Sequence, residues 1–279
     1  MIVEIQKIQN LYKSEGFSGL LETVRRILDF KLLQMRRMVS KFLPSQREKK
    51  LRNAANKLWA NENGSETIKG LSHFKGSGRY KDHEKWEDIG NVHIKMFDRF
   101  CEMTNTDSIE SMIEYGPGGG ANAVKFAPKV SKFYGIDIAK ENLKECGCQL
   151  EQIGFKNYVP VHIAEPKDCL HIPPVDFFLC VAVYQHFPSK EYGVEVGKIA
   201  YDLLKEQGLA IIQIRYAGKY YKPKKRDYRA NVITFTSYGL DEFWNILKKI
   251  GFEPLYLQLR PETNYAYYFA TKGKPHNHH

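Results

Sequence analysis

A glycine-rich turn carries the strongest chemical signal in the sequence. It reads Ile113-Glu114-Tyr115-Gly116-Pro117-Gly118-Gly119-Gly120, and it follows an apolar predicted strand and opens a predicted helix. Glycines suit such a turn because the chain bends sharply and its backbone must come within contact distance of a ligand, which a Cβ atom would prevent. Alone, a glycine-rich turn is weak evidence, since unrelated nucleotide-binding proteins also carry one.

A carboxylate follows the next predicted strand, about twenty residues further on. Asp137 ends that strand in Tyr134-Gly135-Ile136-Asp137-Ile138. Its two oxygens are placed to accept hydrogen bonds from both hydroxyls of a ribose. The turn and the carboxylate together indicate a cofactor that contains adenosine.

Charge discriminates between the adenosine cofactors. Gly116, Gly118 and Ala121 satisfy the loose dinucleotide fingerprint, in which an anionic pyrophosphate sits at the helix start. Glu114, two residues before the first glycine, would repel a pyrophosphate, whereas it would attract the ammonium and sulfonium of S-adenosylmethionine. The methionine carboxylate could still accept from the free backbone N–H groups of the helix start. The sequence therefore favours S-adenosylmethionine.

At these residues the chain resembles class I S-adenosylmethionine-dependent methyltransferases. Glu114-x-Gly116-x-Gly118-x-Gly120, Asp137 and the segment from Asp176 to Pro188 look like the first, second and fourth motifs of that family, and the similarity covers about 83 to 273. The resemblance implies that the glycine turn surrounds the methionine part, that Asp137 binds the ribose and that Ala164 or Glu165 contacts the adenine. The family often has Asp near the adenine, where this sequence offers only Glu165. The implied cofactor-binding set is Glu114, Tyr115, Gly116, Pro117, Gly118, Gly120, Asp137, Ile138, Ala164, Glu165, Val181 and Ala182.

The segment after the fourth predicted strand, Val181-Ala182-Val183-Tyr184-Gln185-His186-Phe187-Pro188, is where the methyl group should meet its acceptor. A sulfonium is already a good leaving group, so the protein chiefly has to align the reactants and exclude water. An alcohol acceptor also benefits from a base, and a histidine such as His186 suits that work. The alternative is that His186 begins a helix or fills a packing position. Tyr184 and Gln185 are expected to line the pocket.

A basic segment interleaved with tyrosines follows the fifth predicted strand. It comprises Arg215-Tyr216 and then Lys219-Tyr220-Tyr221-Lys222-Pro223-Lys224-Lys225-Arg226-Asp227-Tyr228-Arg229. Its cations suit a phosphate or carboxylate, and its ring faces suit sugars or bases. The expected acceptor-binding residues are Arg215, Tyr216, Tyr220, Tyr221, Lys224 and Arg226. The alternative is a solvated loop, which is what most charge runs are.

Strands alternate with helices around these motifs. Apolar patterns predict strands at 109–114, 132–136, 158–163, 175–182 and 208–215, with helices at 83–103, 120–128, 139–153 and 190–205. A helix at 236–249 and a closing hairpin of strands at 252–260 and 265–271 follow. The alternation predicts an α/β fold, a doubly wound, seven-stranded, mostly parallel sheet with the last strand antiparallel. We expect a methyltransferase domain over 83–273, a helical N-terminal extension and lid over 1–82, and a disordered tail over 274–279.

The N-terminal extension is basic and amphipathic. A helix is predicted over 19–43, with an apolar stripe of Leu21, Val24, Leu28, Met35, Met38 and Phe42, and a second basic helix over 46–60. Eleven Lys and Arg against three acids give residues 22–57 a net charge of +8. The stripe could enter an anionic membrane surface while nearby arginines meet head groups. The heptad spacing equally suits the body of the chain or the partner subunit of a homodimer.

Composition bounds the remaining possibilities. The 279 residues are 43% hydrophobic and 27% charged, which is ordinary for a folded globular chain. The five cysteines include no CxxC pair, so they suggest neither a disulfide framework nor a metal cluster, and we expect no bound metal. The sequence shows no secretory signal and no long apolar run, so we expect a cytoplasmic protein.

Within the family, the Trp86-containing helix before the first motif and the long segment after the fifth predicted strand look similar to bacterial enzymes that methylate sugars or lipid-linked glycans. This resemblance implies O-methylation of a sugar, glycan or other small anionic or lipid-linked acceptor. RNA methylation and a non-catalytic assembly role stay open as alternatives.

Overall fold

The computed structural model describes residues 46–60, 64–217 and 236–273, together with seven helical positions between 21 and 39. N-terminal to the sheet are α2 (Glu48–Ala60), α3 (Glu66–Leu71), η1 (Gly78–Lys81) and α4 (His83–Thr104). The strands are β1 (Ser111–Tyr115), β2 (Lys132–Asp137), β3 (Tyr158–His162), β4 (Val175–Cys180), β5 (Leu204–Arg215), β6 (Phe252–Arg260) and β7 (Tyr265–Lys272). Between them lie α5 (Ala123–Phe126), η2 (Ala127–Lys129), α6 (Lys140–Gln152), η3 (Pro166–Cys169), η4 (Tyr184–His186), α7 (Lys190–Leu203) and α8 (Leu240–Ile250).

The seven strands form one sheet in the order β3-β2-β1-β4-β5-β7-β6. Pairing is parallel from β3 to β5, and β7 runs antiparallel to both β5 and β6. The predicted fold and closing hairpin are therefore confirmed. The strand order reverses between β1 and β4, and ligands of such sheets bind beyond the carboxyl ends of the strands at that switch point.

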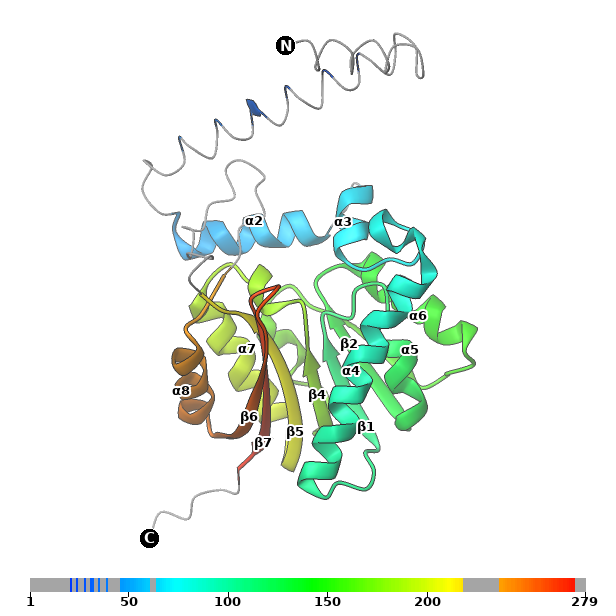
Figure 1. Ribbon diagram of the computed structural model, residues 1–279, viewed down its shortest axis with the longest axis vertical. Coiled ribbons are helices and arrows are strands. Elements are labelled where there is room, and N and C mark those ends of the chain that lie inside the picture. The colour runs from blue at the N-terminus through cyan, green and yellow to red at the C-terminus, as the bar shows by residue number, and fades with distance from the viewer. Residues whose placement is uncertain are drawn as a thin grey trace.

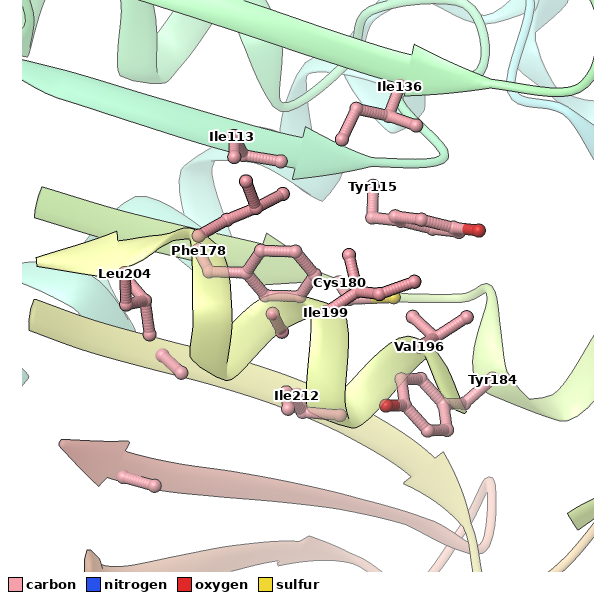
Figure 2. Packing of buried hydrophobic residues seen from close by; sticks show 14 of the residues in the cluster. Ile113, Tyr115, Ile136, Phe178, Cys180, Tyr184, Val196, Ile199, Leu204 and Ile212 are labelled. Carbon is pink, nitrogen blue, oxygen red and sulfur yellow. The ribbon is translucent and has the colours of Figure 1, made fainter. Parts of the chain in front are cut away.

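Helices cover both faces of the sheet (Figure 1). On one face α4, α5 and α6 pack on a cluster that includes Phe100, Phe126, Phe133 and Phe177. On the other face α7 and α8 pack on a second cluster, part of which Figure 2 shows, where Phe178 and Ile212 meet Val196 and Ile199 of α7. The central strands β1, β2 and β4 are nearly continuous apolar runs because both of their faces are buried.

The predicted elements differ from the structure mainly at their ends. The last helix begins at Leu240 rather than at 236, because Thr236 N donates to Gln185 O and Tyr238 bridges to Tyr216. The helix predicted over 120–128 is a single α-helical turn followed by a 3-10 turn. It begins later than predicted because Gly120 still has a positive φ, which is not helical. Within the described part of the chain, no helix has the length and apolar character needed to cross a membrane.

Candidate functional site

A pocket lies at the switch point, beyond the carboxyl ends of β1, β2 and β4. Its walls come from these strand ends and the segments after them: Tyr115, Gly116, Gly118, Ile136, Asp137, Ile138, Asn142, Val181, Ala182, Val183, His186, Phe187, Pro188 and Tyr192. Its remaining lining comes from α2 and the end of α3: Ala55, Asn56, Trp59, Leu71, Ser72 and His73. Figure 1 shows α2 and α3 lying across this end of the sheet. We call residues 48–60 and 64–73 the lid.

The glycine turn is close-packed by the protein itself. Gly116 has φ +77°, its N–H donates to Ile136 O at 2.7 Å, and a Cβ there would lie 2.4 Å from Val183 Cγ2. A Cβ on Gly118 would lie 2.3 Å from Ser72 O, which also accepts from Gly119 N at 2.7 Å. The sequence predicted close approach of a ligand. The structure adds that the lid backbone itself requires glycine at this position.

Asp137 lies at the end of β2, buried at the pocket wall. Its Oδ1 accepts from Ala139 N at 2.9 Å and its Oδ2 from Asn142 Nδ2 at 3.0 Å. Burial raises the pKa of Asp137, and these hydrogen bonds oppose the increase. Each carboxylate oxygen keeps lone-pair capacity for another donor, which fits the two hydroxyls of a ribose.

A directional chain of buried side chains runs behind the glycine turn. Asn122 Nδ2 donates to Glu114 Oε1 at 2.8 Å, so Asn122 Oδ1 accepts from His93 Nδ1 at 2.8 Å. His93 Nε2 is then left as the acceptor for the Tyr267 hydroxyl, 3.4 Å away. Burial lowers the pKa of His93 to about 4, in keeping with this neutral form. Glu114 Oε2 is buried without a hydrogen-bond partner in the described residues.

Glu114 is the most perturbed carboxyl beside the pocket. Burial raises its pKa to about 8, against the hydrogen bond from Asn122, and the nearby Asp137 adds to the increase. A buried carboxyl with one unsatisfied oxygen fits a cationic ligand group, because a positive charge would compensate the cost of ionising it. Glu114, the positive-φ glycines and Asp137 thus fit the ammonium, methionine and ribose parts of S-adenosylmethionine.

We expect Glu114 to make the cofactor-free protein lose stability as the pH rises. The folded chain keeps this proton up to about pH 8, whereas the unfolded chain releases it near its ordinary pKa of 4.5. The contribution is therefore fully present below pH 4.5 and is lost as the pH approaches 8. Glu114→Gln should lack this slope, which amounts to at most about 1.4 kcal/mol per pH unit.

Urea unfolding of both forms between pH 5 and pH 9 measures the difference. Glu110→Gln, which changes an exposed acid just before β1, is the matched control and should follow the wild-type profile. Parallel profiles for wild type and Glu114→Gln would contradict the buried, protonated state of Glu114.

Arg52 fastens the lid to the body. Its guanidinium contacts Glu48 at 3.0 Å, Glu165 at 3.0 Å and Glu195 at 2.8 Å, and it lies 4.8 Å from the Tyr192 ring centroid. Burial opposes the charge of Arg52, but the hydrogen bonds to these carboxylates outweigh it and raise its pKa. Asn56 Nδ2 donates to Ala164 O at 3.0 Å one turn along α2. The lid is therefore held across the ends of β3 and η3.

Replacing Arg52 with methionine should weaken cofactor binding modestly. Methionine keeps an apolar stem over Tyr192 but loses all three ion pairs. Because these side chains are partly exposed, the loss should be about 1 kcal/mol, or roughly five- to tenfold in Kd. Calorimetry with S-adenosylhomocysteine measures it, with Lys57→Met, an exposed cation on the same helix, as the control. An Arg52→Met variant with wild-type affinity would show that the lid does not contribute to cofactor binding.

His186 lies at the pocket, in contact with the lid. Its ring centroid is 4.5 Å from that of Trp59, and its Nε2 is 3.1 Å from Gln185 Nε2, so Gln185 donates and the histidine nitrogen accepts. Ala182 adopts φ +61°, an unusual conformation for a residue with a side chain, and its N–H donates to Gln213 Oε1 at 2.8 Å. Strained backbone of this kind often marks a functional position.

The structure separates the other predicted site residues. Tyr184 is fully buried, and its hydroxyl donates to Gly193 O at 3.1 Å. It belongs to the hydrophobic core shown in Figure 2 and does not line the pocket. Gln185 is also buried. Ala164 and Glu165 both donate backbone N–H groups to Asp168 Oδ2, and the Glu165 carboxylate pairs with Arg52. Contact of Ala164 or Glu165 with adenine stays a prediction.

Part of the predicted acceptor loop lies outside the described residues. This part includes Tyr220, Tyr221, Lys224 and Arg226. The residues at its two ends are described. Tyr238 N donates to Arg215 O at 3.1 Å and Ala217 N donates to Tyr238 O at 3.0 Å, so both ends lie at the carboxyl edge of β5. Sequence reasoning expected a lid within residues 1–82 and a basic helix over 46–60, but it did not single out Asn56, Trp59 or Ser72. Their pocket contacts carry no local sequence signal.

Comparison with known proteins agrees with this fold. Residues 113–212 match the family model described as a methyltransferase domain. A S-adenosylmethionine-dependent methyltransferase from Clostridium acetobutylicum ATCC 824 has a TM-score of 0.53 at 14% identity, covering 69% of this chain and 93% of that one. A proposed methyltransferase from Bacillus halodurans C-125 has a TM-score of 0.52 at 16% identity, covering 63% and 98%. At such identities these likenesses show the fold. No curated protein matches the sequence.

The glycine turn after β1, the carboxylate of Asp137 after β2 and the sheet order are those of the class I methyltransferase fold, and the matched family model covers the turn and Asp137. Over residues 113–212 the chain carries a methyltransferase domain, and S-adenosylmethionine is its cofactor.

Proposed function

We propose that the protein transfers the methyl group to a hydroxyl oxygen of a small anionic acceptor, such as a sugar, a glycan or a lipid-linked molecule. The observation that carries this proposal is the contact of Trp59 with His186, which places a titratable side chain under an aromatic ring of the lid. A pocket bounded in this way suits a single small group better than a nucleic-acid strand. RNA methylation is therefore the second candidate.

The chain's own residues would bind the cofactor, orient the acceptor and deprotonate its hydroxyl. When bound, S-adenosylmethionine supplies a methyl group on a sulfonium, which leaves as a neutral thioether. Glu114, Gly116, Gly118 and Asp137 would hold it, and the lid would exclude water. His186 Nε2 accepts the hydroxyl proton of the acceptor as its oxygen forms the new bond to carbon. The proton thus ends on the imidazole, and the acceptor leaves as a methyl ether.

Methyl transfer to defined acceptors tests the proposal. Hydroxylated carboxylates, sugar phosphates and short RNAs, each supplied with S-adenosylmethionine, can be followed by mass spectrometry of the product and of S-adenosylhomocysteine. We expect products that gain a methyl group among the small anions. Transfer to RNA alone would favour the second candidate. Absence of turnover with every acceptor, despite cofactor binding, would favour a non-catalytic assembly role.

The N-terminal segment supports a further part of the proposal, peripheral contact with an anionic membrane. Seven of its positions are described, all helical and all exposed, and six are apolar: Leu21, Val24, Leu28, Leu32, Met35 and Val39. Spacings of three and four residues place these side chains on one helix face. The arginines of the predicted head-group contact lie outside the described residues. Co-sedimentation with anionic vesicles, with and without residues 1–45, tests this contact, and binding that survives the deletion would refute it.

A further inference from the structure

The backbone N–H groups of the glycine turn are already engaged within the protein. Three of them donate to main-chain oxygens: Gly116 to Ile136 at 2.7 Å, Gly119 to Ser72 at 2.7 Å and Gly120 to Pro117 at 3.0 Å. The N–H of Gly118 is directed to the Asp137 carboxylate, whose pKa burial raises and this contact lowers. Ala121 and Asn122, the next residues, are buried and do not line the pocket. The turn therefore lacks the free N–H groups that the sequence predicted for the methionine carboxylate of the cofactor.

The pocket also offers no cation for that carboxylate. Among its described lining residues there is no lysine or arginine. A carboxylate that leaves water needs hydrogen-bond donors in place of its hydration. Two lining amides are already used, because Asn142 donates to Asp137 and Asn56 donates to Ala164 O. The carboxylate therefore needs a further donor beside the glycine turn.

Two adjacent lid residues, Ser72 and His73, lie with their backbone against the glycine turn. Ser72 O is the acceptor for Gly119 N, and a Cβ on Gly119 would lie 2.4 Å from His73 O. His73 O also accepts from Trp86 Nε1 at 2.7 Å. Both lid residues line the pocket. Their main chain is thus fixed beside the turn.

The side chains of Ser72 and His73 form no hydrogen bonds in the part of the chain that the structure describes. Ser72 is buried, and His73 is partly buried, with its ring centroid 5.1 Å from that of Tyr80. Burial, together with the nearby charge of Arg79, lowers the pKa of His73 to about 4. The ring is therefore neutral at pH 7 and carries one N–H donor. Buried polar groups are normally hydrogen-bonded, so these two are suited to a ligand.

The backbone conformation of His73 is a second, independent observation. His73 follows the C-cap residue of α3, Ser72, and has φ +59°. Helices often end in this left-handed conformation with a glycine, because a Cβ atom disfavours it. The imidazole is thus held at a position where glycine would be more stable. Strain of this kind at a pocket wall points to a functional side chain.

We propose that Ser72 and His73 bind the methionine carboxylate of S-adenosylmethionine, in place of the N–H groups of the glycine turn. The Ser72 hydroxyl and one ring N–H of His73 donate to its two oxygens when the cofactor is bound. Because both residues belong to the lid, recognition of the carboxylate requires the lid to be closed. This role is independent of the acceptor and of the proposed O-methylation, since it concerns the cofactor alone.

Calorimetry with two ligands tests this role. S-adenosylhomocysteine has the carboxylate, whereas decarboxylated S-adenosylhomocysteine keeps the amine and lacks only the carboxylate. His73→Gly should weaken S-adenosylhomocysteine binding about tenfold or more, and Ser72→Ala about fivefold. Neither variant should change the affinity for the decarboxylated ligand. His73→Asn should give an intermediate affinity, because asparagine tolerates the left-handed backbone and keeps an N–H donor.

Asn105→Gly is the matched control, because Asn105 ends α4 with φ +50° and does not line the pocket. It should leave both affinities unchanged. The ratio of the two affinities stays informative if a variant loses stability, because misfolding weakens both ligands alike. Equal affinities of the wild type for the two ligands, or variant losses that are the same for both, would overturn the role of Ser72 and His73. Methyl transfer to RNA alone, with the affinities as expected, would instead refute the proposed function alone.

Discussion

Replacing Asp137 with alanine should raise the Kd for S-adenosylhomocysteine by about 100-fold or more. The carboxylate would accept hydrogen bonds from two ribose hydroxyls, and bonds to a charged group contribute about 1.5–3 kcal/mol each. Asp137 is buried at the pocket wall, so water cannot fully replace the lost acceptor. Calorimetry on the cofactor-free protein measures the change.

The same carboxylate also orders the start of α6, so the control must separate binding from folding. Asp137 accepts from Ala139 N and Asn142 Nδ2 in the absence of ligand. Asp137→Asn keeps the shape and one acceptor oxygen, and it should lose less affinity than alanine. Asn142→Ala removes only a supporting hydrogen bond. If Asp137→Ala folds with a wild-type Tm and binds the cofactor product normally, the ribose assignment is wrong.

Replacing His186 with glutamine should lower the single-turnover rate by about 10²–10⁴-fold, the usual contribution of a positioned base. Gln185 Nε2 donates to His186 Nε2, so this ring nitrogen carries a lone pair. The hydroxyl of the methyl acceptor could take the place of Gln185 and donate to the same nitrogen. Glutamine preserves polarity and approximate size against Trp59 but cannot take up a proton. Cofactor affinity should change little, because the role proposed for His186 is toward the acceptor and not toward the cofactor.

Quench-flow with a saturating acceptor distinguishes a base from a packing residue. A base predicts that the wild-type rate depends on pH and that this dependence disappears in His186→Gln. Trp59→Phe is the matched control, because it retains an aromatic lid contact and should retain the pH profile. A His186→Gln rate close to wild type between pH 6 and pH 9 would show that catalysis proceeds by alignment alone.

Most of the catalytic domain could be predicted from local sequence patterns. The apolar runs place β1 to β5 within a few residues of their observed bounds, and β6 and β7 form the predicted hairpin. Glycines with positive φ lie at Gly116, Gly118 and Gly120, where the turn was predicted. These features depend on residues close together in the chain, and parallel pairing then brings Glu114 and Asp137 to one edge without further information.

The lid side of the pocket depends on residues that are far apart in the chain. Arg52 meets Glu165 and Glu195 across 113 and 143 positions, and Asn56 meets Ala164 across 108. Ser72 O accepts from Gly119 N, and His73 O accepts from Trp86 Nε1. Residue types and spacing were enough to identify the cofactor and the order of the elements, since both follow from local chain geometry. The roof of the pocket, the burial of Tyr184 and the contact of the lid with the glycine turn arise from packing between distant segments, and only the folded chain brings those segments together.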